Sequence, residues 1–223
     1  MKNLLHFHIY HGDDMARELW EDRGKKVWLK VSGVIGITAP LIAFTLILLA
    51  IAYSPQFSWT ENVLSDLGAQ EGVTAVLFNS GLIIGGFLAL VFALGLFLFL
   101  GKKMLGEIGA FLLVLATLAL ITIGAFPSSN VNPTHYYASV TFFVLLPLSI
   151  FVIGTALLLM HEVKIGLFAL LVAIIAAVPW IIYLSTRFIP NNAIIETISA
   201  LSASTWSIIS GHKMLKQPSQ SNR

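Results

Sequence analysis

Six long runs of apolar residues, each bounded by polar or charged positions, dominate the pattern of the chain. The hydrocarbon core of a bilayer is about 30 Å thick, and a helix needs roughly 20 mostly apolar residues to cross it. Backbone amides in hydrocarbon must bond within their own element, so runs of this length predict helices rather than strands. The pattern therefore predicts an all-α integral membrane bundle with spans at Val31–Tyr53, Thr74–Leu100, Glu107–Phe126, Tyr137–Met160, Ile165–Leu184 and Asn192–Gly211.

Lysine and arginine are unequally divided between the two sides of these spans. Positively charged residues collect on the cytoplasmic side of multi-pass proteins. Among the loops that would face the opposite side, only the last carries such a residue, Arg187. We therefore expect three outward-facing hairpins in a cell membrane, with both termini cytoplasmic. The cytoplasmic set is Arg23, Lys25, Lys26, Lys30, Lys102, Lys103, Lys164, Lys213 and Lys216.

The same charges divide the chain into three parts. For residues 1–30 the sequence predicts a cytoplasmic amphipathic segment with a helix beginning near Asp14. Residues 31–212 are expected to form the six-helix membrane domain. Residues 213–223 form a polar C-terminal tail.

Composition supports the membrane assignment and narrows the chemistry. Of 223 residues, 57% are hydrophobic and 11% are charged, whereas a soluble domain carries about 25% charged residues. A net charge of +2 without a basic stripe gives no reason to expect a nucleic-acid partner. The chain has no cysteine, which excludes disulfides, thiol catalysis and cysteine-ligated zinc.

The first outer connection carries the densest group of polar residues. Ser58 and Glu61 have the spacing of a capping box, which predicts a short helix beginning there. On that helix Asn62, Ser65 and Asp66 would share one face. This helix either lies flat at the membrane surface with its polar face in water, or turns that face toward the bundle as part of a site.

His135 is expected in the first turn of the fourth span, beside two tyrosines. It is either an interfacial residue of the aromatic belt, or a proton carrier or metal ligand, since its ordinary pKa of about 6.5 suits both tasks.

Glu196 lies one turn into the sixth span, where a carboxylate is costly unless it meets a partner or a cavity. Small residues below it predict a packed seam, so Glu196 should point into the bundle. It forms either a structural ion pair with Arg187 or part of a site. The small residues are Ser199, Ala203, Ser207 and Ser210.

Asn79 lies about one turn inside the second span, followed by Gly81 and Gly85. The Gly-x-x-x-Gly spacing predicts close helix packing. A buried amide needs hydrogen-bond partners, so Asn79 is a candidate ligand-binding residue.

One functional hypothesis is a membrane-embedded hydrolase acting on lipid. Asp66, His135 and Glu196 come from three connections at a similar outer depth, and together they could hold a divalent metal that activates water. Without metal, His135 could act as general base oriented by Asp66. Ser65 is a candidate nucleophile, and Arg187 could bind a phosphate.

The other hypothesis, which the residues favour slightly, is a protein that binds a lipid headgroup or a small solute at an outer polar site. Asn62, Asn79 and Arg187 are its candidate ligand-binding residues. A partner membrane protein is a further possible ligand, and a purely structural scaffold is a third reading. Ion-coupled transport is disfavoured, because no ionisable residue falls near the midplane of a span.

Short motifs spread along the chain resemble the uncharacterised multi-pass membrane family known as domain of unknown function 998. The resemblance covers about Val31 to Gly211 and implies a six-helix membrane protein, with no established activity or catalytic residues. The motifs are Ser65-Asp66-Leu67-Gly68, Phe78-Asn79-Ser80-Gly81, Phe126-Pro127 and His135-Tyr136-Tyr137-Ala138-Ser139.

Overall fold

The computed structural model of the chain describes residues 2–101, 103–128, 133–186 and 191–216, with side chains described from Trp20 onward. Within these residues all regular secondary structure is helical. The helices are α1 (Lys2–Ala52), α2 (Asp66–Ala69), α3 (Val73–Leu100), α4 (Met104–Ala125), α5 (Thr134–Leu159), α6 (Val163–Thr186) and α7 (Ala193–Leu215).

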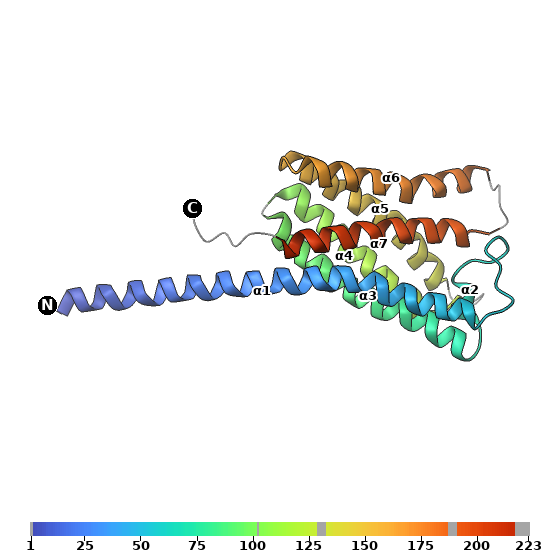
Figure 1. The fold of residues 1–223 in the computed structure, drawn as a ribbon, viewed down its shortest axis with the longest axis horizontal. Helices are drawn as coiled ribbons and strands as arrows, with labels where there is room; N and C mark the ends of the chain where they lie inside the picture. Colours follow the sequence, from blue (N-terminus) through green and yellow to red (C-terminus); the bar gives the residue numbers. More distant parts are fainter. Residues whose placement is uncertain (1, 102, 129–132, 187–190, 217–223) are drawn as a thin grey trace.

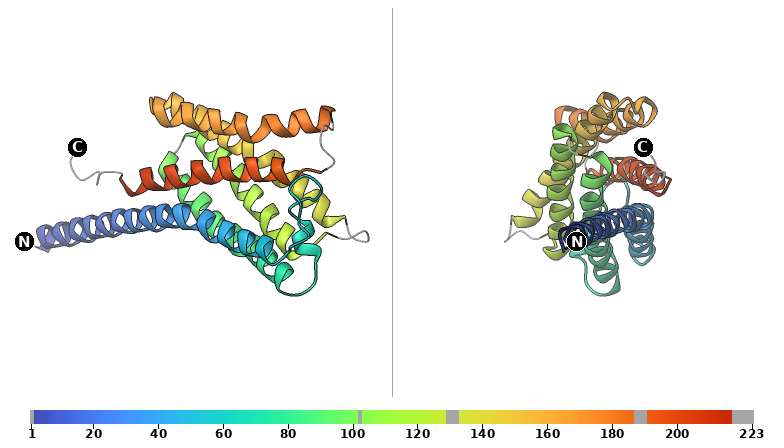
Figure 2. Two further views of the ribbon diagram at one scale, coloured as in Figure 1. Left: turned by 45° about the vertical axis from the view of Figure 1, so that its right-hand side comes forward. Right: turned by 90° about the vertical axis from the view of Figure 1, so that its left-hand side faces the viewer.

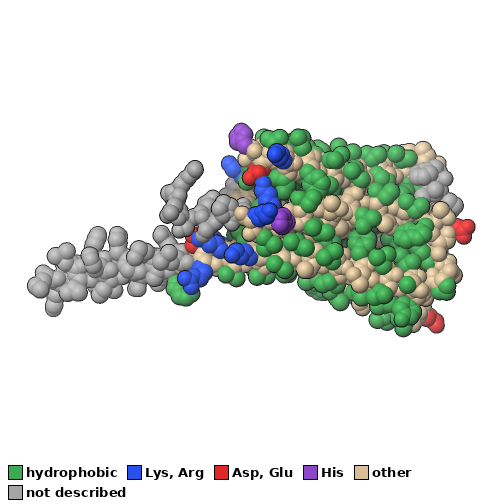
Figure 3. Space-filling view, in the orientation of Figure 1, with side chains coloured by type: hydrophobic (Ala, Val, Ile, Leu, Met, Phe, Trp, Pro, Cys, Tyr) green, Lys and Arg blue, Asp and Glu red, His purple; other side chains and the backbone are tan. Residues whose placement is uncertain are grey.

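Six helices in the described part of the chain are long and apolar enough to cross a membrane. They are α1 and α3 to α7, and they correspond to the six predicted spans. Apolar side chains cover much of the side of the bundle (Figure 3), as a lipid-facing surface requires. The prediction of an all-α, multi-pass membrane protein is confirmed.

The long helices form a ring in chain order. Each of α3 to α7 packs against the long helix before it, and α7 packs back against α1. Figures 1 and 2 show the short α2 beside one end of α3, outside this ring. The ring arrangement places the inner faces of several helices around a common interior.

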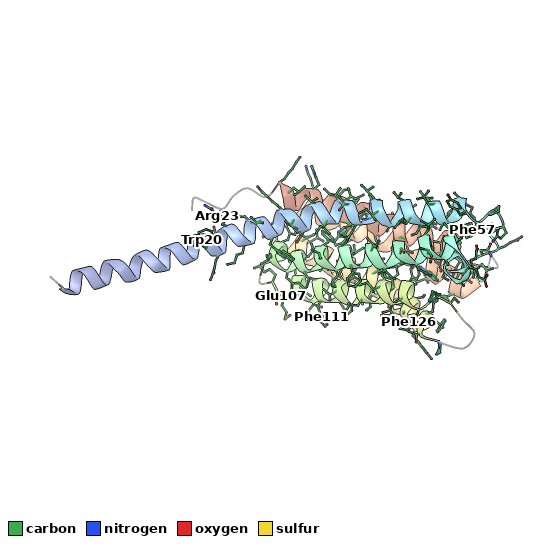
Figure 4. All side chains as sticks on the ribbon, turned by 90° about the horizontal axis from the view of Figure 1, so that it is seen from below. Trp20, Arg23, Phe57, Glu107, Phe111 and Phe126 are labelled. Carbon is green, nitrogen blue, oxygen red and sulfur yellow. The ribbon has the colours of Figure 1, made fainter. Side chains whose placement is uncertain are left out.

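The two ends of the bundle differ, and we name them for what they carry. The loop end is the end of the bundle at which α1, α4 and α6 finish and α3, α5 and α7 begin (Figure 1). The short helix α2 also lies at this end. At the opposite, tail end, α3 and α5 end, and α7 reaches its last turn. Figure 4 shows Phe57 and Phe126 at the loop end and Glu107 at the tail end. Lysine and arginine side chains gather toward the tail end (Figure 3).

Helix α1 runs without a break from Lys2 to Ala52 and projects beyond the tail end (Figures 1 and 4). The sequence predicted a helix from Asp14 and a boundary at residue 31, but the helix crosses both positions. No proline precedes Pro40, and a single interior glycine costs a helix only about 1 kcal/mol. Local sequence therefore offers nothing strong enough to stop the helix.

Close contacts between α1 and its neighbours explain the glycines and small residues of the spans. A Cβ atom on Gly85 would lie 2.8 Å from the Cβ atom of Ala43 on α1, so the predicted packing role is confirmed. A Cβ atom on Gly211 would lie 2.6 Å from the carbonyl oxygen of Gly33. The Ser207 hydroxyl donates to the Gly36 carbonyl oxygen at 2.8 Å across the same α1–α7 contact. Ser207 of the predicted seam thus packs on α1, whereas the Ser199 hydroxyl donates to the Ala176 carbonyl oxygen on α6 at 2.7 Å.

Candidate functional site

A cavity of about 170 Å³ lies inside the ring of helices. Its lining comes from α1, α3, α4, α5, α7 and the segment before α2, and most of the lining residues are apolar. Large side chains among them include Phe78 and Phe92 on α3 and Phe142 on α5. An engineered apolar protein cavity of about 150 Å³ binds benzene. The cavity is therefore large enough for a small organic group or part of a hydrocarbon chain.

The cavity is elongated and begins at the loop end. On α7 its lining extends from Glu196, in the first turn, to Ser207. At about 1.5 Å per helical residue, these positions are about 16 Å apart along the helix axis. This is about half of a hydrocarbon core that is roughly 30 Å thick. The cavity thus matches the depth of one lipid leaflet.

Glu196 supplies the charged group of the cavity lining. The side chain is 9% exposed, and its Oε2 atom accepts a hydrogen bond from the backbone N–H of Leu64 at 2.9 Å. Among the described lining residues there is no other charged side chain. Ser65, next along the chain from Leu64, also lines the cavity. The prediction that Glu196 points into the bundle is confirmed.

Residues 53–72, which we call the cap segment, connect α1 to α3 and are bonded to the start of α7. The Asn191 side-chain amide donates to the carbonyl oxygen of Glu61. The backbone N–H of Ala193 donates to the carbonyl oxygen of Asn62 at 3.3 Å. With the Leu64–Glu196 bond, these contacts hold residues more than 120 positions apart in the chain. The cap segment therefore closes over the α7 side of the loop end.

Side chains within the cap segment bind its own backbone. Asp66 Oδ2 accepts from the Val63 N–H at 3.1 Å and from the Asn62 side-chain amide at 3.2 Å. Asn62 Oδ1 accepts from the Ser58 N–H at 2.8 Å. Adjacent N–H groups, of Val63 and Leu64, thus bind two different carboxylates.

These bonds correct the capping-box prediction. The predicted helix from Ser58 does not form, and the helix covers only Asp66–Ala69. Asn and Asp side chains compete with helical hydrogen bonds by binding nearby backbone groups. Here Asn62 and Asp66 do so, and turns replace the first part of the predicted helix.

The other edge of the cap segment is bonded to α3. The Asn79 side-chain amide donates to the carbonyl oxygen of Gly68 at 3.0 Å, whereas its Oδ1 atom is buried without a partner among the described residues. Leu64 and Leu67 are 8% and 0% exposed, packed into the hydrophobic core below. Asn79 therefore supports the cap segment from beneath.

His135 is buried but is not part of the cavity lining. Its Nδ1 atom lies 2.9 Å from the carbonyl oxygen of Phe126, which can only accept, so Nδ1 donates. The bond joins the first turn of α5 to the residue that follows α4. Within the described residues no three His, Asp or Glu side chains are grouped closely enough to hold a metal.

The structure thus brings together some of the predicted site residues and leaves others apart. Ser65 and Glu196 share the cavity, and Asn62 and Asp66 hold the adjoining turn. Arg187 lies outside the described residues, so its ion pair with Glu196 stays a prediction.

Sequence analysis missed the cavity itself and Trp206 at its deeper part. Trp206 is 2% exposed, packs edge-on against Phe92 with ring centroids 5.9 Å apart, and lines the cavity. Its Nε1–H has no hydrogen-bond partner among the described residues. Helical spacing places Trp206 near the face that carries Ala203 and Glu196, and this was the available signal.

Comparison with known proteins identifies the family. A family model described as Protein of unknown function (DUF998) matches residues 37–213, from within α1 to near the end of α7. No curated protein and no solved structure matches the chain. The match covers most of the chain and agrees with the resemblance found in its motifs, so this multi-pass membrane protein belongs to the DUF998 family of proteins of unknown function.

Proposed function

We propose that this protein binds an amphiphilic molecule from the membrane, with the hydrocarbon chain in the central cavity and the polar head beneath the cap segment. The observation that carries the proposal is the cavity of about 170 Å³, whose largely apolar lining includes a single described carboxylate at the loop end. Ligand sites are commonly apolar clefts with a few polar groups that orient the ligand.

The arrangement of α1 and α7 suits access from the bilayer. The two helices meet closely in the half of the bundle near the tail end, at Gly33 and Gly211. They separate toward the loop end in Figures 1 and 2. Cavity-lining residues of this separating half, Pro40 on α1 and Ala200 on α7, are partly exposed. A lipid chain could pass between the helices at this level.

The loop end faces the outside of the cell in this proposal. Its basis is the collection of lysine residues toward the tail end, which the positive-inside tendency assigns to the cytoplasm. The bound head would then lie at the level of the outer leaflet of the cell membrane.

The geometry gives no comparable support to the hydrolase hypothesis. Hydrolysis without metal required His135 beside Asp66, yet His135 bonds to the carbonyl oxygen of Phe126 and Asp66 bonds within the cap segment. Binding is therefore the function that we develop.

Fluorescence quenching tests the proposal. A variant that keeps Trp206 as its only tryptophan would be reconstituted in liposomes with single-chain amphiphiles brominated along the chain, bearing alcohol, amine, carboxylate or phosphate heads. Bromine quenches tryptophan only at short range, and Trp206 is 2% exposed. We expect at least one amphiphile to quench Trp206 saturably, because it must enter the cavity to reach the ring.

Two controls make the result specific. A variant that keeps only Trp180, a partly exposed residue of α6 outside the cavity lining, reports quenching from the bilayer. Ala200→Phe fills the cavity and should abolish saturable quenching, whereas Ala52→Phe adds the same ring at an exposed site and should not. Linear quenching that is equal in the Trp206 and Trp180 proteins would refute the binding proposal.

A further inference from the structure

The charge and the hydrogen-bonding capacity of the cavity lining restrict the kind of head group that it can hold. We propose that the cavity selects single-chain amphiphiles whose head donates hydrogen bonds and has no negative charge, such as a long-chain alcohol or amine, with Glu196 as the acceptor. This inference rests on the proposed binding function and names its ligand class.

The charges in and beside the cavity are unfavourable for an anionic head. Glu196 is the charged residue of the described lining, which contains no lysine or arginine. A second carboxylate, Asp66, is held nearby on the N–H of Val63, next to the Leu64 N–H that Glu196 binds. Phosphate and carboxylate heads are normally bound by arginine, lysine or free backbone N–H groups. An anionic head here would instead meet the Glu196 carboxyl group, with Asp66 nearby and no cation among the described lining residues to offset its charge.

The N-terminus of α7 does not reverse this preference. A helix N-terminus attracts anions through its free N–H groups and its dipole. The Ala193 N–H, however, is bonded to the carbonyl oxygen of Asn62, and the Glu196 N–H is bonded to that of Asn192. Glu196 itself supplies negative charge in the first turn. The Ala193 N–H is thus already used, and the Glu196 carboxyl group in the first turn opposes a second anion at this helix end.

The cavity lining also has unused capacity to form hydrogen bonds with a head group. Glu196 Oε2 accepts from Leu64, and within the described residues its other oxygen accepts no hydrogen bond. A carboxylate can accept about four hydrogen bonds. Ser65 lines the same cavity, and a serine hydroxyl group can both donate and accept. An alcohol head can donate to Glu196 and accept from Ser65, and an amine head can donate to both.

The dimensions of the cavity suit a single hydrocarbon chain. A lining of about 16 Å along α7 with a volume of about 170 Å³ describes a narrow space, suited to one chain rather than two. At its deeper part the buried Trp206 N–H has no hydrogen-bond partner among the described residues, and leaving a buried donor unsatisfied is destabilising. An oxygen or a double bond along the bound chain would give this group an acceptor. The orphan donor is thus an independent sign of an occupant.

Competition experiments test the head-group preference. In the protein that keeps only Trp206, dodecanol, dodecylamine and dodecyl phosphate would be compared as competitors of a brominated amphiphile, at bilayer concentrations corrected for partitioning. We expect dodecanol and dodecylamine to displace the quencher at concentrations about tenfold or more below that of dodecyl phosphate.

Glu196→Gln links the preference to this side chain. Glutamine keeps an oxygen that can accept from the Leu64 N–H but removes the charge, so dodecyl phosphate should become nearly as effective as dodecanol. Glu61→Gln, at an exposed position of the cap segment, should leave the wild-type preference unchanged.

The outcomes separate the two proposals. Equal or better displacement by dodecyl phosphate in the wild-type protein would overturn the head-group inference while leaving the binding function intact. An unchanged preference in Glu196→Gln would also overturn it, because selection would then arise elsewhere. If no brominated amphiphile quenches Trp206 at all, the binding function itself fails.

Discussion

The loop end and the tail end of the bundle hold their connecting segments in different ways. At the loop end, the cap segment is bonded to α3 through Asn79 and to α7 through Glu196 and Ala193, and it buries Leu67 completely. At the tail end, the contact that the described residues show between α7 and a connecting segment is the ion pair of Lys213 with Glu162, which lies between α5 and α6, and both side chains are substantially exposed.

The difference is one of solvation. A buried polar group that loses its partner costs about 1–3 kcal/mol, whereas an exposed ion pair contributes about 0–1 kcal/mol. Polar residues at the loop end therefore determine the local tertiary structure and shape one end of a cavity. The Lys213–Glu162 pair at the tail end, being substantially exposed, constrains the structure there far less. The predictions below test this contrast.

The largest expected effect is an all-or-none difference in chemical labelling. The chain has no cysteine, so Glu71→Cys at the loop end and Met104→Cys at the tail end each introduce a single exposed thiol. In intact cells, a membrane-impermeant maleimide should label Glu71→Cys, and should label Met104→Cys only after permeabilisation. The reverse pattern would show that the loop end is cytoplasmic.

A smaller effect is expected when each end loses one carboxylate. Glu196→Leu removes the acceptor of the buried Leu64 N–H, and should destabilise the folded protein by about 1–3 kcal/mol. Glu162→Leu removes the exposed partner of Lys213, and should cost less than about 1 kcal/mol. Thermal unfolding in one detergent provides the comparison. Equal shifts in the two variants would contradict the proposed difference between the ends.

Two glycine substitutions should have effects of opposite sign, and the effect of the substitution at Gly24 is the smallest expected. In Gly68→Ala the new methyl group would overlap Asn79 Oδ1 and lie 2.9 Å from a ring carbon of Phe78, forcing a shift that should cost about 1–3 kcal/mol. Gly24, in the projecting part of α1, has no atom within 4 Å of such a methyl group. Gly24→Ala should therefore stabilise that helix by about 0.5–1 kcal/mol.

Amide hydrogen exchange of the protein in the membrane distinguishes the two glycine variants. Amide hydrogen exchange should quicken at residues 66–69 in Gly68→Ala and slow around residue 24 in Gly24→Ala. Faster exchange near residue 24 in the alanine variant would contradict the assignment of an open helical surface there.

Features that depend on local apolar pattern were predicted well. The six spans, the inward position of Glu196 and the packing role of Gly85 follow from hydropathy and helical periodicity. The prediction was wrong where two backbone conformations of the same segment, helix and turn, compete. The capping-box pattern at Ser58 favoured a helix, but Asn62 and Asp66 bind backbone groups of the same segment and favour turns.

The site shows the same division. The sequence predicted Ser65 and Glu196 as candidate site residues because both are polar and lie at a similar outer depth. In the structure both residues line one cavity. His135 was predicted as a candidate site residue for the same reason, but its side chain bonds to Phe126 at the end of α4. Depth along a helix can be read from sequence, whereas the direction in which a side chain points around the bundle depends on neighbouring helices.

By itself, therefore, the sequence determined an all-helical membrane protein with six spans, because burial of apolar side chains and internal satisfaction of backbone amides act within each segment. Only the tertiary structure decided that the ring of helices leaves a cavity, that Trp206 lines it and that the Leu64 N–H meets Glu196. These contacts join residues far apart in the chain, and their geometry arises from how the helices pack together.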